Sequence, residues 1–134
     1  MITGSCACGA VRFEVTAPFD TAGYCHCKRC QRRSGALWSL NAMVAPDALR
    51  IVAGADAIRT WRPADGSPKT FCAACGGHLY SGDESTGVVG VRLGTLDGDP
   101  GIRPQWHQWL ESAPDWEPIP DDGLPRFQQR RDIG

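Results

Sequence analysis

Short stretches of alternating apolar and polar residues dominate this chain, and a period of two is typical of strands with one buried face. Residues 11–16 alternate strictly, while residues 88–93 form a nearly continuous apolar run that indicates a strand inside a sheet. Residues 37–44 also alternate, and the apolar side chains that share one face are Trp38, Leu40, Ala42 and Val44. The pattern predicts further short strands at residues 21–25, 49–52, 57–61, 69–71, 78–80 and 105–110.

Glycine and proline mark the turns between these strands. Gly54 lies between residues 49–52 and 57–61, which predicts that these two stretches pair as a hairpin. The sequence Cys-Ala-Ala-Cys-Gly at residues 72–76 also lies between two strands, and this arrangement is typical of the hairpin called a zinc knuckle. Residues 28–34 are polar and predict one or two turns of helix, closed by Gly35.

The predicted fold class is mainly β, with small antiparallel sheets packed around metal and few short helices. A chain of 134 residues is long enough for one domain, and we expect residues 1–134 to form it, with an irregular tail from about residue 112. The apolar share of 42% allows a buried core, while 16 glycines and 10 prolines favour turns over long helices.

The charge pattern argues against several classes of partner. A net charge of -1 and acidic side chains in the tail disfavour general binding to nucleic acid. No apolar run approaches the roughly 18 residues that cross a membrane. The first residues also lack the charged and apolar regions of a signal peptide. We therefore expect a cytoplasmic protein with no membrane partner.

The seven cysteines carry the strongest chemical signal in the sequence. An odd number fits a disulfide framework poorly, and a reducing cytosol disfavours stable disulfides. Their spacing is C-x-C, then C-x-C-x-x-C, then C-x-x-C, at Cys6, Cys8, Cys25, Cys27, Cys30, Cys72 and Cys75. Thiols spaced this closely are typical of metal ligands, so we predict that all seven bind zinc.

The residues favour a division of the cysteines into four and three, with two zinc ions per chain. Cys6 and Cys8 are two positions apart, so an extended backbone points both at one ion, and Cys72 and Cys75 do the same from a tight turn. These four thiolates would make a structural zinc site. Cys25, Cys27 and Cys30 would then hold a second zinc with an open fourth position, which is a feature of catalytic zinc.

Two alternatives stay open from the spacing alone. The closed group could instead comprise Cys6, Cys8, Cys25 and Cys27, with the open site formed by Cys30, Cys72 and Cys75. The four-cysteine set could also hold an iron–sulfur cluster, although the knuckle pattern is more typical of zinc.

Other polar residues lie near Cys25, Cys27 and Cys30, here called the triplet, and each has two interpretations. If Cys25 and Cys27 face the metal from an extended backbone, His26 faces away from it. His107 could complete the site or act as a base, but a packed, hydrogen-bonded histidine is the expected role. Four basic residues could form a docking patch for an anionic small molecule or simply a solvated helix face: Lys28, Arg29, Arg32 and Arg33.

Five segments resemble the glutathione-dependent formaldehyde-activating enzymes, which share a domain with centromere protein V. The first three hold the cysteine motifs, at residues 4–13, at 25–30 with Ser34 and Gly35, and at 71–76. Residues 114–116 and 124–127 are similar to the tail of that family. The resemblance therefore extends from Gly4 to about Phe127, and three cysteine motifs in the same order are specific.

The resemblance implies a β-tent fold and a function. It implies that Cys6, Cys8, Cys72 and Cys75 are structural ligands and that Cys25, Cys27 and Cys30 are catalytic. The implied activity condenses glutathione with formaldehyde to S-hydroxymethylglutathione, a carbon–sulfur lyase reaction in reverse. Bound zinc would favour the thiolate form of glutathione. The alternatives are a zinc-stabilised β module that binds without turnover, or a family member that acts on another thiol or aldehyde.

Overall fold

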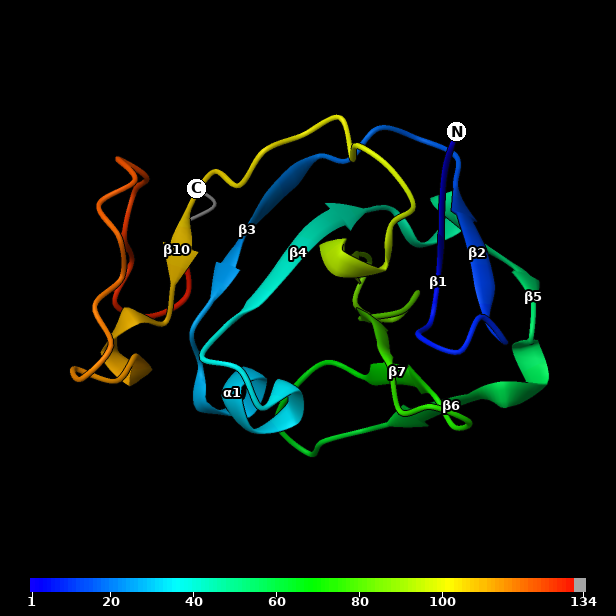
Figure 1. Cartoon of the computed structure of the whole chain (residues 1–134), viewed down its shortest axis with the longest axis horizontal. Helices are drawn as coiled ribbons and strands as arrows, with labels where there is room; N and C mark the ends of the chain where they lie inside the picture. The colour runs from blue at the N-terminus through cyan, green and yellow to red at the C-terminus, as the bar shows by residue number, and fades with distance from the viewer. Residues whose placement is uncertain (132–134) are drawn as a thin grey trace.

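The computed structural model describes residues 1–131, which form two β-sheets and one α-helix. The mainly β fold predicted from the sequence is confirmed (Figure 1). The smaller sheet has the strand order β1 (Ile2–Ser5), β2 (Arg12–Val15), β5 (Leu49–Ala53). The larger sheet has the order β10 (His107–Gln108), β3 (Thr21–Cys25), β4 (Ser39–Val44), β9 (Val89–Arg92), β8 (His78–Ser81), β7 (Lys69–Cys72), β6 (Ile58–Trp61).

The core lies between the two sheets and is built from the alternating positions that the sequence shows. Val11, Phe13 and Val15 are buried from the first alternating stretch, while Arg12 between them is exposed. Leu79 and Val91 from the larger sheet belong to the same cluster, and both are fully buried. Burial of each such side chain contributes roughly 1.5–3 kcal/mol, so this cluster holds the sheets together.

Helix α1 (Lys28–Ser34) connects β3 to β4 and confirms the predicted short helix. Cys27 is its N-cap, and the Cys27 sulfur accepts a hydrogen bond from the backbone N–H of Cys30. Gly35 ends the helix with a φ of 72°. Short 3-10 helices occupy four connections: η1 (Pro46–Ala48), η2 (Ala55–Ala57), η3 (Leu93–Thr95) and η4 (Leu110–Ser112).

Two predicted pairings have different outcomes. The knuckle hairpin is confirmed, because β7 and β8 pair antiparallel on either side of the C-x-x-C turn. The hairpin between residues 49–52 and 57–61 is wrong, because β5 pairs with β2 whereas β6 pairs with β7 in the other sheet. Helix η2 lies between β5 and β6 and carries the chain from one sheet to the other. Alternation identifies a strand but does not identify its partner.

Strand boundaries near the triplet also differ from the prediction. The strand predicted over residues 37–44 begins at Ser39, and Trp38 lies outside it with 43% of its surface exposed. The predicted central strand is confirmed, because β9 lies between β4 and β8. Strand β1 was missed, since Ile2–Ser5 is short and contains a single large apolar side chain.

The tail runs alongside β10 at one side of the molecule (Figure 1). Strand β10 pairs in parallel with β3, and His107 exchanges backbone hydrogen bonds with the tail through Pro125 and Phe127, each at 2.9 Å. After η4 the described tail has no strand or helix, apart from an isolated bridge at Arg126. No helix within residues 1–131 is long and apolar enough to cross a membrane.

Candidate metal centre and active site

Four cysteines from two distant turns bring their sulfur atoms together. The Sγ atoms of Cys6, Cys8, Cys72 and Cys75 all lie within 4.8 Å of one another. The Cys6–Cys8 separation is 3.6 Å and the Cys8–Cys72 separation is 3.9 Å. Four tetrahedral Zn–S bonds of about 2.3 Å place sulfur atoms about 3.8 Å apart. This group therefore has the size and the donor set for one zinc ion.

The two turns that carry this group have the same local design. Gly9 and Gly76 each follow the second cysteine of a pair, with φ values of 79° and 75° that glycine adopts without steric cost. These turns aim backbone N–H groups at sulfur. The N–H groups of Cys8 and Gly77 lower the pKa of the Cys75 thiol to about 6, because they stabilise its thiolate.

The other three cysteines form a second group where β3 leads into α1. The Sγ atoms of Cys25, Cys27 and Cys30 lie within 4.8 Å of one another. Within residues 1–131 no further histidine, cysteine, aspartate or glutamate joins the four ligand atoms of the first group or the three of the second. The sulfur atoms thus gather four and three, and not in the alternative division. Metal binding by these residues stays a prediction.

The pKa values of the triplet thiols depend on one another, and the pattern favours binding of a cation. Hydrogen bonds from Cys25 and Cys27 bring the pKa of the Cys30 thiol far below its usual range. Hydrogen bonding to Cys27 raises the pKa of Cys25 instead. One thiolate therefore forms readily, and its charge opposes the next ionisation. A divalent metal relieves this repulsion, since it binds thiolates and releases their protons.

A cavity of about 210 Å³ adjoins the triplet and is lined by Cys25 and Cys30. Two half-buried cations line the same cavity, Lys69 from β7 and Arg92 from β9. Burial lowers the pKa of both side chains, while the nearby triplet thiolates act in the opposite direction on Arg92. The cavity therefore combines sulfur ligands with positive charge.

Arg92 is held in place by neutral partners. Its guanidinium donates to Asn41 Oδ1 and, at 2.9 Å, to Ser81 Oγ. Its Nε is buried and has no hydrogen-bond partner among the described residues. No carboxylate within residues 1–131 lies within 4.0 Å of this guanidinium, so its charge remains available to anionic sulfur or to an anionic ligand.

A sequence model of the family described as glutathione-dependent formaldehyde-activating enzyme matches residues 1–112. The matched residues include all seven cysteines and both cations of the cavity. The chain belongs to this family. The resemblance predicted from the cysteine motifs is thereby confirmed, and the matched segment ends where the irregular tail begins.

Relatives and a solved structure agree with the family membership. A Halomonas elongata protein, named for glutathione-dependent formaldehyde activation, is 32% identical over 128 residues, covering 89% of this chain and 81% of that protein. A similarly named Pyrenophora teres f. teres protein is 29% identical over 77 residues, or 56% of this chain and 40% of that one. The crystal structure of a Rhodobacter sphaeroides protein superposes with a TM-score of 0.59 and 30% identity, covering 76% of this chain and 91% of the other.

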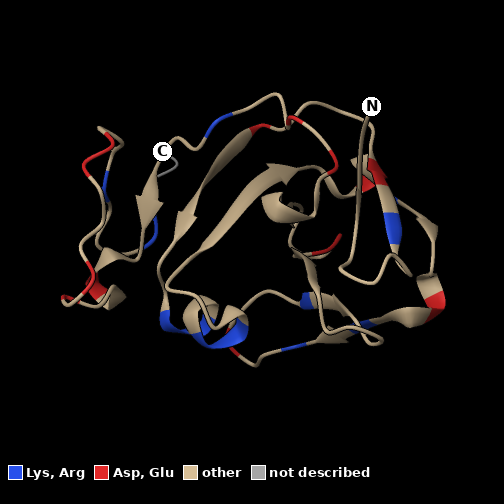
Figure 2. Cartoon of the chain, viewed as in Figure 1, with Lys and Arg blue, Asp and Glu red and all other residues tan. Residues whose placement is uncertain are grey.

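In this member of the family, the predicted docking patch lies along α1 (Figure 2). Arg29 forms an ion pair with Asp65 and lies 5.6 Å from the centre of the Trp61 ring. Arg33 Nη1 is buried without a partner among residues 1–131. The lining of the cavity beside the triplet includes none of the four patch residues, Lys28, Arg29, Arg32 and Arg33. Their role in docking stays a prediction.

Sequence reasoning missed the two cations that do line this cavity. Arg92 lies in the otherwise apolar run of residues 88–93, and a charged side chain in a central strand is costly unless it is paired. That signal was visible in the sequence. Lys69 directly follows the turn at Pro68 and gave no comparable signal, because its position depends on the pairing of β7 with β8.

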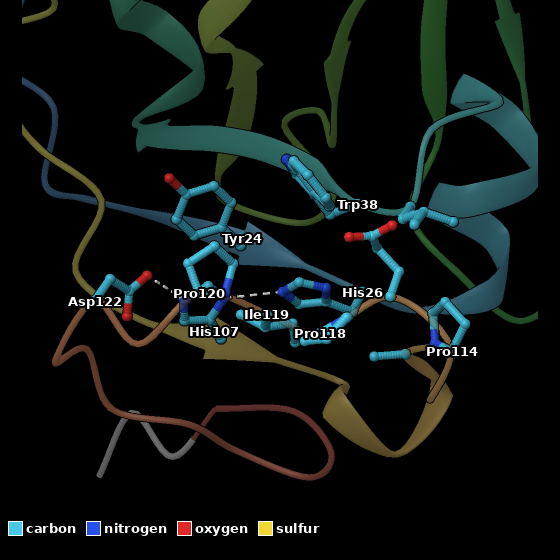
Figure 3. Close-up of a pocket in the computed structure, with 12 residues that line it drawn as sticks. Tyr24, His26, Trp38, His107, Pro114, Pro118, Ile119, Pro120 and Asp122 are labelled. Atoms are coloured by element: carbon cyan, nitrogen blue, oxygen red, sulfur yellow. Dashed lines mark hydrogen bonds and ion pairs between the residues drawn. The ribbon is translucent and has the colours of Figure 1, made fainter.

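His26 and His107 form a hydrogen-bonded pair on the other side of the triplet backbone (Figure 3). Alternation predicts that His26 faces away from the sulfurs of its neighbours, and the structure shows it lining a different cavity, with His107. His26 Nε2 lies 2.9 Å from His107 Nδ1, and His107 Nε2 lies 2.7 Å from Asp122 Oδ2. His107 is therefore a packed histidine, as expected, and does not complete the triplet.

Proposed function

We propose that this protein condenses glutathione with formaldehyde to S-hydroxymethylglutathione, at a zinc ion held by Cys25, Cys27 and Cys30. The observation that carries the proposal is the three-sulfur group, which has no fourth ligand among the described residues and adjoins a cavity lined by two cations. The family description and the names of two relatives support the choice of substrates. In the reverse direction the reaction is that of a carbon–sulfur lyase, and the reducing cytoplasm is the proposed compartment.

The proposal assigns two zinc ions different tasks. The ion held by Cys6, Cys8, Cys72 and Cys75 would be structural. An ion held by Cys25, Cys27 and Cys30 would supply Lewis acidity that favours the thiolate form of a thiol near neutral pH. Arg92 offsets the negative charge of the triplet sulfurs, since its guanidinium lies beside them and is not neutralised by a carboxylate of the described residues.

The cavity selects the sulfur end of a peptide-like thiol. Its volume of about 210 Å³ is smaller than the roughly 300–1,000 Å³ of most ligand pockets, so it accommodates part of the substrate rather than the whole. Lys69 can bind a carboxylate of the thiol, because it lines the cavity and, within residues 1–131, its ammonium donates to the neutral hydroxyl of Ser67, at 3.0 Å, and to no carboxylate.

The reaction forms one carbon–sulfur bond and moves one proton from sulfur to the aldehyde oxygen. Ser81 lines the cavity, and its Oγ accepts a hydrogen bond from Arg92. Its own O–H can therefore donate to the aldehyde oxygen as negative charge develops there. Holding both reactants in one cavity makes the addition effectively unimolecular.

The test is the rate of S-hydroxymethylglutathione formation, measured by NMR exchange spectroscopy with zinc-loaded protein. Thiols add to formaldehyde without a catalyst, so the rate must exceed that of a sample without protein. We expect acceleration by the native protein and none by Cys27→Ser, which should remain folded. Other small thiols measured in parallel show whether glutathione is preferred.

Two results would overturn the proposal. Acceleration that survives in Cys27→Ser would place the chemistry elsewhere. If native, zinc-loaded protein accelerates the reaction with none of the thiols, the protein is instead a zinc-stabilised β module that binds without turnover. Faster reaction with another thiol than with glutathione would keep the zinc chemistry and replace the substrate.

A further inference from the structure

A second cavity, of about 590 Å³, lies on the side of β3 that His26 faces (Figure 3). Its volume falls within the roughly 300–1,000 Å³ of small-molecule sites. None of the seven cysteines lines it, so it is separate from both candidate metal groups. Neither the family chemistry nor the cysteine motifs account for a cavity of this size at this place.

Aromatic rings make up one wall of this cavity. Tyr24 stacks on His107 with ring centres 4.6 Å apart and an angle of 11° between the planes. Trp38 meets Tyr24 edge-on, with 6.3 Å between ring centres and an angle of 81°. Trp38, with 43% of its surface exposed, and the half-buried Tyr24 line the cavity with flat rings, which favour planar aromatic ligands that stack or pack edge to face against them.

The opposite wall comes from the tail and is well supported. Proline residues 114, 118 and 120 line the cavity, and proline restricts the backbone before any ligand arrives. Arg126 Nη2 donates to the carbonyl of Pro120 at 2.7 Å, and Gln31 Nε2 donates to the carbonyl of Ser112 at 2.9 Å. The wall lies beyond residue 112, outside the segment that matches the family.

A chain of hydrogen bonds determines which atom the cavity offers to a ligand. Asp122 is a carboxylate at neutral pH and accepts from His107, which therefore carries its proton on Nε2. With a neutral His107 imidazole, its Nδ1 accepts from His26, which then carries its proton on Nε2. His26 Nδ1 is left as an acceptor, and it makes no hydrogen bond with the described residues although the His26 side chain is 2% exposed.

The charged side chains that line the cavity disfavour anions, although Arg126 lies behind the Pro120 wall. Glu117 and Asp122 line it, and its lining includes no lysine or arginine. An anionic thiol such as glutathione suits the cavity beside the triplet, where Lys69 and Arg92 lie, and not this one. The two cavities therefore select ligands of different charge.

We propose that this cavity binds an uncharged planar aromatic molecule that carries an O–H or N–H group, and that this group donates to His26 Nδ1. The aromatic wall supplies the contact area, the proline wall preorganises the site, and the histidine pair supplies one specific acceptor. This proposal does not depend on the proposed reaction at the triplet, because the two cavities share no lining residue.

Calorimetric titration of the zinc-loaded full chain with three naphthalene derivatives tests the ligand chemistry. The first probe is 2-naphthol, which is uncharged at pH 7 and has an O–H donor. We expect 2-methoxynaphthalene, which lacks the donor, to bind at least fivefold more weakly, and 2-naphthoate, an anion, at least tenfold more weakly. Equal binding of the naphthol and its methyl ether, or absence of naphthol binding, would overturn the proposal.

Two tryptophan variants test the location of binding. Trp38 and Trp61 are similarly exposed, at 43% and 46%, but only Trp38 lines this cavity. Trp38→Ala should weaken 2-naphthol binding at least tenfold, whereas Trp61→Ala should change it less than twofold. Equal effects of the two substitutions, or no effect of Trp38→Ala, would show that the naphthol binds elsewhere. The unfolding midpoints of both variants confirm that they are folded.

Discussion

The sulfur atoms of Cys8 and Cys72 lie 3.9 Å apart although 64 positions separate the two residues in the chain. This contact joins the turn after β1 in the smaller sheet to the end of β7 in the larger one. A metal ion bound at this place would close a long loop, and its binding energy would become part of the folding free energy. The triplet lies within one local segment and closes no such loop.

The first prediction is that Cys75→Ser loses folded protein. Cys75 is exposed, so the substitution removes little packing, and any large loss of stability reports the loss of a metal ligand. A structural zinc contributes on the order of 10 kcal/mol to the folding free energy, and a site with one weakened ligand should lose several kcal/mol of it. The measurement is the denaturant midpoint with zinc present and after chelation.

Cys27→Ser is the matched control, because it removes a ligand from the local group. We expect its unfolding midpoint to stay close to that of the native protein. Equal destabilisation by Cys75→Ser and Cys27→Ser would contradict the assignment of structural and catalytic roles.

The second prediction concerns metal content and its order of release. Purified protein should contain two zinc ions per chain, and mild chelation should remove the triplet ion first, because three ligands leave an open position for the chelator. Elemental analysis and a colorimetric zinc indicator follow both ions. In Cys27→Ser, which should stay folded, the rapidly released ion should be missing and the other ion should remain. A visible iron–sulfur chromophore in fresh protein would count against zinc.

The third prediction separates two candidate cations for substrate binding. Lys69→Met keeps most of the side-chain volume and removes the charge that lines the cavity beside the triplet. We expect KM for glutathione to rise about tenfold, since a hydrogen bond to a charged group contributes about 1.5 kcal/mol or more. Added salt should weaken binding in the native protein more than in this variant.

Lys28→Met makes the same chemical change on α1, within the basic patch that the sequence suggested. Lys28 is exposed and contacts Gln31, and it does not line the cavity. Its substitution should therefore change KM less than twofold. A larger effect at Lys28 than at Lys69 would restore the helix patch as the docking site.

The sequence predicted those features that depend on local pattern. Alternation at residues 11–16 gave the buried face of β2, and the C-x-x-C-G sequence at residues 72–76 indicated the hairpin of β7 and β8. The spacing also favoured the division of the cysteines into four and three, because two cysteines in one tight turn can face the same ion, although only the structure decided between the two divisions. These features need no knowledge of which strands pair.

Features that depend on pairing between distant strands could not be predicted. Lys69 reaches the triplet cavity only because β7, β8 and β9 are consecutive neighbours in the larger sheet. His26 and His107 meet because β10 pairs in parallel with β3, and the sequence predicted a strand over residues 105–110 but not its partner. The second cavity needs that pairing and the tail as well, so nothing local in the sequence announced it.

The last prediction tests the contact that holds β10 beside β3. Gly23 lies in β3, and a Cβ atom at this position would overlap the ring of Trp106, which is 5% exposed and donates from Nε1 to Thr21 Oγ1 at 2.9 Å. Because Trp106 is confined by this bond, the strand rather than the ring must move. Gly23→Ala should therefore cost about 1–3 kcal/mol of unfolding free energy, the usual range for overpacking.

Gly94→Ala is the control for Gly23→Ala, because a Cβ atom at Gly94 meets no other atom within 4 Å. Its effect on the urea midpoint should stay within about 0.5 kcal/mol. Since β10 supplies His107 to one cavity and Gln108 to the other, Gly23→Ala should also weaken naphthol binding and slow the thiol reaction. A Gly23→Ala protein as stable and active as Gly94→Ala would show that β10 can shift without disturbing either cavity.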